Sequence, residues 1–185
     1  MEFADAWGQV ERAGGVAIMT PPELEALWGC VELGDMVLEI GTAYGGTASL
    51  LALKGAVVHT VDSGESGQTV AAEQLFEKLG IAYKISSYVE KSSEVRLPEM
   101  QFDLVLIDGA HWGDIPYQDM CRFAPRVKPG GWLALDDVAN GHPDITKGVM
   151  KWISWEKEFS FHNAYSEQFD GVRWETKLSL FRRDG

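Results

Sequence analysis

The stretch FDLVLIDGAHWGDIPYQDMCRFAPRVKPGGWLALDDV, residues 102–138, decides the fold. Its first apolar run, 102–107, stops at Asp108, and a second run, WLALDD at 132–137, ends in two acids. Helix-forming sequence at 117–127 separates the two runs. Continuous apolar runs joined by a helix are typical of parallel strands in a sheet that is covered on both faces.

The same alternation extends toward the N-terminus. Glycines and prolines mark the turns, as at Gly80 and in KPGG at 128–131. The expected strands are 36–40, 56–61, 81–86, 102–107 and 132–137, and the expected helices between them are 45–54, 69–80 and 117–127. This order predicts a doubly wound α/β fold.

Both ends of the chain depart from that alternation. Residues 20–33 read as a helix, with Thr20 as its cap and two prolines in its first turn. After residue 140 we expect a helix over 144–158 and then an antiparallel hairpin at the sheet edge. Its strands would be 159–165 and 177–183, with a turn at 169–171 between them.

The length and composition indicate one domain. A chain of 185 residues with 45% hydrophobic residues can bury a substantial core. We expect a single domain over 1–185, made of an N-terminal helical cap (1–34), a cofactor-binding core (35–139) and a C-terminal helix and hairpin (140–185).

Charge and cysteine content exclude several classes of protein. A net charge of −12 opposes binding to nucleic acid, which relies on clustered Lys and Arg. No apolar run approaches the roughly 20 residues that span a membrane. Cys30 and Cys121 lack metal-type spacing, and the N-terminus does not resemble a secretion signal. A cytoplasmic protein with free thiols is expected.

The first expected strand runs into a glycine-rich turn, LEIGTAYGG. Gly41 and Gly45 let the backbone pass close to a ligand, and Asp62 follows 21 residues after Gly41, a spacing that suits a carboxylate on a ribose diol. Ala43 occupies the second glycine position of a dinucleotide fingerprint. Glu39 would repel a pyrophosphate but tolerate an ammonium group, which favours S-adenosylmethionine over NAD.

These features together resemble a known family. VLEIGTAYGGTASLLA (37–52), Asp62 and residues 102–138 are similar to the class I S-adenosylmethionine-dependent methyltransferases. The likeness is to the small O-methyltransferases related to catechol and sugar methyltransferases, and it covers about residues 35–139. It implies a Rossmann-like sheet of seven strands in the order 3-2-1-4-5-7-6, with strand seven antiparallel.

The resemblance also implies a cofactor site. Gly41 and its neighbours would line the methionine moiety, Glu39 would meet its ammonium group directly or through water, and Asp62 would hold the ribose hydroxyls. Either Ser92 or Glu90 would contact adenine. The implied cofactor residues are Glu39, Gly41, Thr42, Tyr44, Gly45, Asp62, Ser63, Ser92 and Asp108. Tyr44 faces either the cofactor or solvent.

In the metal-dependent branch of this family, acids at the ends of strands four and five bind a divalent cation. Asp108, Asp136 and Asp137 match those positions. Oxygen ligands favour Mg²⁺, with Mn²⁺ or Ca²⁺ as alternatives. His111 would then be the general base, since the unperturbed pKa of an imidazole is about 6.5. Asp108 would take part in catalysis through the cation.

Each of these residues also has a plainer interpretation. Asp62 and Asp108 could cap the helices that follow them. Asp136 and Asp137 point to opposite faces in a regular strand, so both must bend inward to share an ion. His111 could be a packing residue, and His142 is either a catalytic residue or an ordinary loop residue.

The sequence therefore predicts an S-adenosylmethionine-dependent O-methyltransferase that acts on a small hydroxylated acceptor with the help of a divalent metal ion. Because residues 1–34 are a short segment, a large lid over the substrate would have to come from elsewhere. A homodimer could supply the missing lid. Two alternatives are a protein that binds S-adenosylmethionine without transferring a methyl group, and a nicotinamide-dependent oxidoreductase. Neither the acceptor nor the oligomeric state follows from the sequence.

Overall fold

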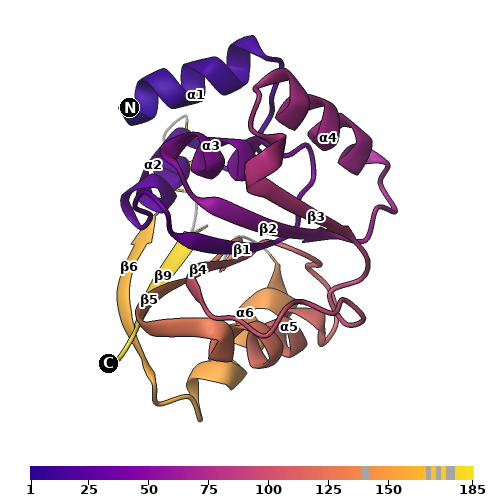
Figure 1. Ribbon diagram of the computed structural model, residues 1–185. Coiled ribbons are helices and arrows are strands. Elements are labelled where there is room, and N and C mark those ends of the chain that lie inside the picture. Colours follow the sequence, from indigo (N-terminus) through magenta and orange to yellow (C-terminus); the bar gives the residue numbers. More distant parts are fainter. Residues whose placement is uncertain (139–141, 166–167, 170–171, 174–177) are drawn as a thin grey trace.

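A seven-stranded sheet organises the protein (Figure 1). The computed structural model describes residues 1–138, 142–165, 168–169, 172–173 and 178–185. The strand order is β3-β2-β1-β4-β5-β9-β6. The strands of this sheet are β1 Met36–Ile40, β2 Val57–Asp62, β3 Ile85–Val89, β4 Phe102–Ile107, β5 Val127–Leu135, β6 Phe159–Tyr165 and β9 Leu178–Arg183.

Strands β1 to β5 pair in parallel, while β9 is antiparallel to both β5 and β6. The predicted order, with an antiparallel seventh strand, is confirmed.

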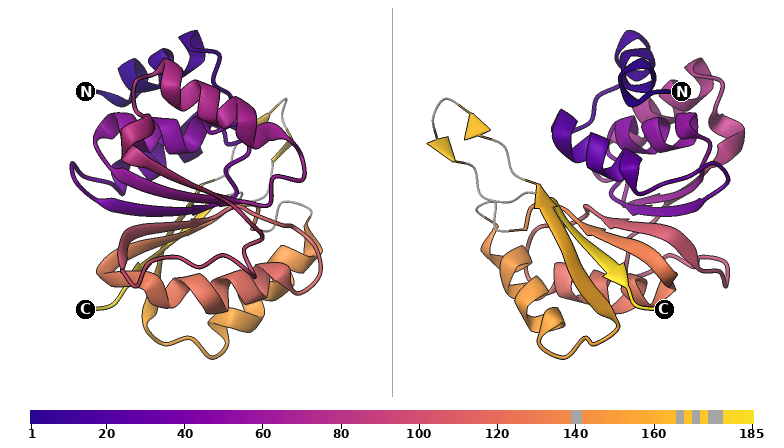
Figure 2. Two further views of the ribbon diagram at one scale, coloured as in Figure 1. Left: turned by 45° about the vertical axis from the view of Figure 1, so that its right-hand side comes forward. Right: turned by 90° about the vertical axis from the view of Figure 1, so that its left-hand side faces the viewer.

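Helices cover both faces of this sheet (Figures 1 and 2). One face carries α1 Phe3–Arg12, α2 Pro21–Gly29, α3 Gly46–Lys54 and α4 Gln68–Lys78, and the other carries α5 Ile115–Phe123 and α6 Pro143–Ile153. Two hydrophobic clusters fill the spaces between the sheet and its helices. Burial on both faces is why the central strands read as continuous apolar runs. Among the residues that the structure describes, no helix is long and apolar enough to cross a membrane.

The N-terminal helices follow local signals. Thr20 and Glu23 form a capping box in front of α2, because the Glu23 carboxylate accepts hydrogen bonds from the backbone N–H (2.7 Å) and the hydroxyl (2.8 Å) of Thr20. The helix ends at Gly29, earlier than the expected residue 33. Helix α1 lies in the part of the sequence with the weakest pattern and was expected only as part of a helical cap.

The largest differences from the predicted boundaries lie at β3, at β5 and at α6, which ends at Ile153 instead of residue 158. Strand β3 begins at Ile85 instead of residue 81, because the short 3-10 helix η1 Ala82–Lys84 intervenes. The KPGG sequence is not a turn before β5 but lies inside it, at a shift in the register with β4. Gly130, at φ +74°, allows that irregularity. A second 3-10 helix, η2 Ala124–Arg126, connects α5 to β5.

The expected terminal hairpin is present as the antiparallel pair β6 and β9. Of the predicted turn at 169–171, residues 170 and 171 lie outside the described residues. Between the two long strands, β7 Gln168–Phe169 pairs with β8 Val172–Arg173 as a separate two-stranded sheet. Figure 2 shows these short strands away from the main sheet.

Trp152 anchors α6 on the sheet. Its side chain is 1% exposed, and its ring meets those of Phe159 (centroids 5.4 Å apart) and Phe181 (5.9 Å). The indole Nε1 is buried without a hydrogen-bond partner among the described residues. The ring therefore contributes through packing alone.

We expect Trp152→Ala to lower the free energy of unfolding by about 3–5 kcal/mol, because it leaves a large cavity. Trp152→Phe should cost much less, since it keeps an aromatic ring and removes a buried unpaired N–H, which itself costs about 1–3 kcal/mol. Urea denaturation measures both. A loss below about 1 kcal/mol in Trp152→Ala would show that α6 is not anchored through this ring.

A buried acid holds the segment after β3 against α5. Asp119, 3% exposed, lies beside the Ser92 hydroxyl and the Arg122 guanidinium. Arg122 donates to the carbonyl oxygens of Ser92 (2.5 Å) and Val95. Burial raises the pKa of Asp119 to about 6, although Ser92 and Arg122 lower it. The carboxyl group thus keeps its proton to higher pH in the folded chain.

This shift predicts a pH-dependent stability. As the pH rises, the unfolded chain releases the Asp119 proton near its ordinary pKa of 3.8 and the folded chain only near 6. The stabilisation is fully present below about pH 4 and is lost by about pH 6, a change of about 3 kcal/mol. Asp119→Asn should remove this loss. Urea denaturation should therefore show that the free energy of unfolding of the variant rises relative to that of the wild type between about pH 4 and pH 6. The matched control is Asp5→Asn, which changes an exposed acid. The prediction would be contradicted if the difference in free energy of unfolding between Asp119→Asn and the wild type did not change with pH.

Candidate active site

The backbone ladder continues past the ends of the central strands. The Asp108 N–H donates to the Ile40 carbonyl (2.8 Å), and the Asp136 N–H donates to the Ile107 carbonyl (3.1 Å). The residues that follow β1, β4 and β5 are therefore held in register at one edge of the sheet. In open α/β sheets this carboxyl edge is where ligands bind.

The glycine turn after β1 packs tightly against the end of β4. Gly41 has φ +106°, and a Cβ atom there would lie 1.9 Å from the Asp108 carbonyl oxygen. Gly45 adopts φ +77° immediately before α3. The structure thus gives Gly41 a packing role, besides any contact with a ligand. Tyr44, in the same turn, is 39% exposed.

Glu39 is buried beneath this turn. Its Oε2 accepts a hydrogen bond from the Thr60 hydroxyl (2.5 Å), which lies 2.5 Å from the hydroxyl oxygen of Thr42. Burial, together with the charges of Asp108 and Asp62, raises the pKa of Glu39 to about 8, although the Thr60 hydrogen bond lowers it. Three acids so arranged form a setting in which a cationic ligand is favourable.

Asp62 joins the glycine turn to the loop after β2. Its Oδ2 accepts from the Ala43 N–H (3.1 Å), and its Oδ1 accepts from the Gly64 N–H (2.9 Å). Ser63, next to it, is exposed. An ion pair between Glu65 and Lys91 (3.2 Å) links this loop to the one that follows β3, where Ser92 lies. The expected ribose and adenine residues thus occupy neighbouring loops.

Carboxylates from β4 and β5 converge beside His111. One oxygen from each of Asp108, Asp136 and Asp137 lies within 4.8 Å of the other two. Asp137 has φ +54°, a left-handed conformation that breaks the strand alternation and allows both neighbouring acids to serve one site. The His111 Nε2 lies 3.5 Å from Asp137 Oδ2 and 3.8 Å from Asp108 Oδ1.

The electrostatics of this cluster fit a bound cation. Burial, together with the nearby charges of Asp108, Asp137 and Glu23, raises the pKa of Asp136 to about 9. Burial also raises the pKa of Asp108, although His111 lowers it. The Asp136 Oδ1 is buried without a hydrogen-bond partner among the described residues. Such oxygen donors are the ligands that Mg²⁺ and Ca²⁺ prefer.

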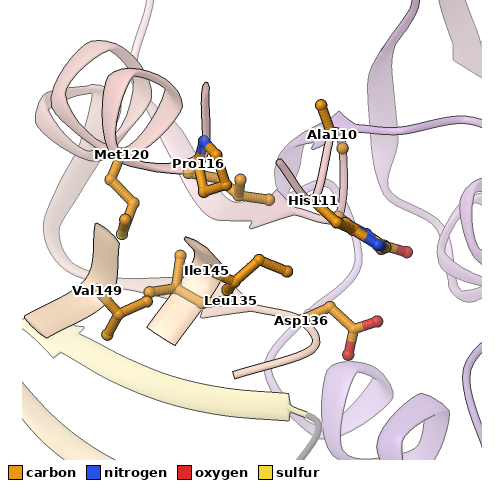
Figure 3. Close-up of a pocket in the computed structure, with 11 residues that line it drawn as sticks. Ala110, His111, Pro116, Met120, Leu135, Asp136, Ile145 and Val149 are labelled. Atoms are coloured by element: carbon orange, nitrogen blue, oxygen red, sulfur yellow. The ribbon is translucent and has the colours of Figure 1, made fainter. Parts of the chain in front are cut away.

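A narrow pocket with room of about 20 Å³ for water-sized molecules, partly open to solvent, leads from these acids toward α5 and α6 (Figure 3). His111 and Asp136 lie at one end of it, whereas Met120 and Val149 form the opposite, apolar end. Ala110, Pro116, Leu135 and Ile145 also line it. The pocket combines a polar mouth with an apolar interior.

Sequence reasoning missed Thr60 and the role of Glu23 at this edge, and it left the role of His142 open. Thr60 holds Glu39, and the capping residue Glu23 lies near enough to Asp136 to raise its pKa. His142, expected as either a catalytic or an ordinary loop residue, places Nε2 4.0 Å from Asp137 Oδ2. The alternation of side chains along β2 could have indicated Thr60. The roles of Glu23 and His142 depend on contacts between segments that are distant in the sequence.

Comparison with known proteins agrees with this architecture. A family model described as a methyltransferase domain matches residues 38–138. No curated protein sequence matches the chain. The O-methyltransferase TomG from Streptomyces achromogenes, solved with S-adenosylmethionine, is 18% identical with a TM-score of 0.73, over 99% of this chain and 89% of that one.

Two other solved structures are similar to the same extent. Rv0187 from MTB, solved with its cofactor, is 19% identical with a TM-score of 0.74, over 98% of this chain and 89% of that one. The O-methyltransferase from Bacillus cereus, solved with S-adenosylhomocysteine, is 16% identical with a TM-score of 0.71, over 98% and 90%. At these identities the likeness establishes the fold.

The family model spans more than half of the chain, and the sheet order is the one that the family resemblance implied. The chain therefore belongs to the methyltransferase domain family and is a class I S-adenosylmethionine-dependent methyltransferase.

Proposed function

We propose that this enzyme is an O-methyltransferase that methylates a hydroxyl group of a small acceptor with the help of a divalent cation. The observation that carries the proposal is the convergence of Asp108, Asp136 and Asp137 beside the His111 imidazole. The cluster lies at the same edge of the sheet as the glycine turn. Cation, base and cofactor site would thus border one space.

S-adenosylmethionine supplies an electrophilic methyl group when it is bound. In this proposal Glu39 accepts hydrogen bonds from its ammonium group, Asp62 holds the ribose hydroxyls, and Ser92 lies toward the adenine. Gly41, Thr42 and Gly45 line the methionine moiety, with Tyr44 and Ser63 at the outer margin of the site. The acidic surroundings of Glu39 support a ligand with two positive centres.

His111 is the proposed general base. Its Nε2 lies within 4 Å of oxygens from both Asp108 and Asp137, and its side chain is 29% exposed, so an acceptor can reach it. A neighbouring carboxylate orients an imidazole and stabilises it after it accepts a proton. A cation held by Asp108, Asp136 and Asp137, with Mg²⁺ as the first choice, would lower the pKa of the acceptor hydroxyl.

The acceptor class follows from charge and shape. A net charge of −12 disfavours nucleic acids, and the pocket beyond His111 is small and apolar at its inner end. A hydroxylated small molecule meets both conditions. The proposal places the enzyme in the cytoplasm, where Cys30 and Cys121 remain free thiols, and treats residues 1–185 as one domain. A homodimer could complete the acceptor site.

Glu39→Gln should separate stability from cofactor binding. Removing a buried carboxylate whose pKa is raised to about 8 should raise the melting temperature at neutral pH. The same change removes a carboxyl group that a bound ammonium group would hold in its charged, accepting form, so S-adenosylhomocysteine should bind about 10–100-fold more weakly. Calorimetric titration and thermal unfolding measure the two effects. Unchanged affinity would remove Glu39 from the cofactor site.

The test of the proposed function is a titration with S-adenosylhomocysteine and with Mg²⁺, on the wild type and on Asp136→Asn. We expect both proteins to bind S-adenosylhomocysteine but only the wild type to show a Mg²⁺ binding heat. Asp136→Asn should also melt at a higher temperature in metal-free buffer, because it relieves the repulsion among the three acids. Failure of the wild type to bind S-adenosylhomocysteine would overturn the proposal, and binding without any Mg²⁺ heat would remove the cation from it.

A further inference from the structure

We propose that His111, Asp137 and His142 form a second metal site, which takes a transition metal ion such as Zn²⁺ or Co²⁺ in preference to Mg²⁺. Both imidazoles approach the same oxygen, Asp137 Oδ2, which lies 3.5 Å from His111 Nε2 and 4.0 Å from His142 Nε2. The two ring centroids are 4.7 Å apart. One ligand atom from each of the three residues lies within 4.8 Å of the other two.

These spacings are close to those of a tetrahedral ion. Ligands about 2.0–2.1 Å from Zn²⁺ lie about 3.3–3.4 Å from one another. The contact between His111 and Asp137 already has this length within a few tenths of an ångström, and the contact with His142 exceeds it by about 0.6 Å. A small rotation of an imidazole that is 42% exposed can close that gap.

The ligand types separate this site from the carboxylate cluster. Asp108, Asp136 and Asp137 offer only oxygen, which suits Mg²⁺, whereas imidazole nitrogens favour Zn²⁺, Co²⁺, Ni²⁺ and Fe²⁺. Two imidazoles and one carboxylate leave a fourth position for water or another ligand, as in many zinc enzymes. Asp137 belongs to both sets and can use its two oxygens for two ions.

Local structure holds the two histidines together. The Gly113 N–H donates to the Asp144 carboxylate (2.7 Å), which ties the loop after β4 to the first turn of α6. His142 immediately precedes α6, and its carbonyl accepts from the Thr146 N–H (3.2 Å). Asp137, in its left-handed conformation, lies between the two segments. The donor atoms are thus carried by backbone that is fastened at several points.

A transition metal ion at this site would affect the proposed reaction. It would occupy the Nε2 lone pair of His111, the atom that serves as the proposed base. Zn²⁺ should therefore inhibit methyl transfer even when Mg²⁺ is present. This consequence rests on the proposed function, but the existence of the site does not.

Cobalt provides a direct test, because its visible absorption strengthens when the ion moves from octahedral water to a four-coordinate site. The experiment uses untagged, metal-free protein titrated with Co²⁺, followed by competition with Zn²⁺. Wild type and Asp136→Asn should both develop the absorption band. His142→Ala should bind Co²⁺ more than about 100-fold more weakly, because losing even a residue that only supports a metal ligand lowers metal affinity by about 10–100-fold. The matched control is His162→Ala, which removes an exposed imidazole from β6.

Mg²⁺ titration of the same proteins completes the comparison. His142→Ala should keep the Mg²⁺ heat, and Asp136→Asn should lose it while keeping the Co²⁺ band. Wild-type Co²⁺ affinity in His142→Ala, confirmed with His142→Gln, would overturn the inference, and so would loss of the Co²⁺ band in Asp136→Asn. A Co²⁺ band with the expected variants but no Mg²⁺ heat in any protein would support the inference and contradict the metal requirement of the proposed function. Thermal unfolding of each variant confirms that it is folded.

Discussion

The backbone register at the carboxyl edge of the sheet is the constraint on which the site depends. Main-chain hydrogen bonds continue one residue beyond β1, β4 and β5, so the turn at Gly41, the end of β4 and the end of β5 are aligned. The carbonyl oxygen of Asp108 occupies the space that a side chain at position 41 would need. Any residue other than glycine would push these strand ends apart, and with them the acids that they carry.

That alignment creates an electrostatic problem. Glu39, Asp108 and Asp136 are all brought to one edge with raised pKa values, and burial is the leading cause for each. A purely structural site would not place several poorly solvated carboxyl groups together, because each costs folding free energy in its charged form. Strain of this kind is typical of places where function has been selected over stability. The arrangement is consistent with ligands that arrive with positive charge.

The fold was largely predictable because its signal is local. Continuous apolar runs and glycine stops identified β1, β2 and β4 almost to the residue, and the family resemblance supplied the strand order. The errors arose where local signals compete. In IAYKIS, residues 82–84 form a 3-10 helix before β3, and the KPGG sequence lies within β5, where the register with β4 is irregular. Tertiary contacts determine the secondary structure of such segments, and these contacts cannot be inferred from composition.

The site was predictable only in part, for the same reason. Strand-end acids are visible in the sequence because each follows an apolar run. Contacts between distant elements are not visible in the sequence. His142 meets Asp137 across a loop, and Asp119 meets Ser92 across the space between β3 and α5. Roles in cofactor binding, metal binding and proton transfer therefore remain predictions, although the positions of the residues are known.

Asp137 connects the two halves of the site. Its Oδ2 lies near both imidazoles, and an oxygen of the same carboxylate lies near Asp108 and Asp136. An ion bound on one side withdraws charge from this carboxylate and changes its affinity for an ion on the other. Because ligands that bind only the folded chain also stabilise it, metal occupancy and folding are linked through this residue. The side chain that breaks the strand alternation thus couples metal identity, the state of the proposed base and the stability of the edge.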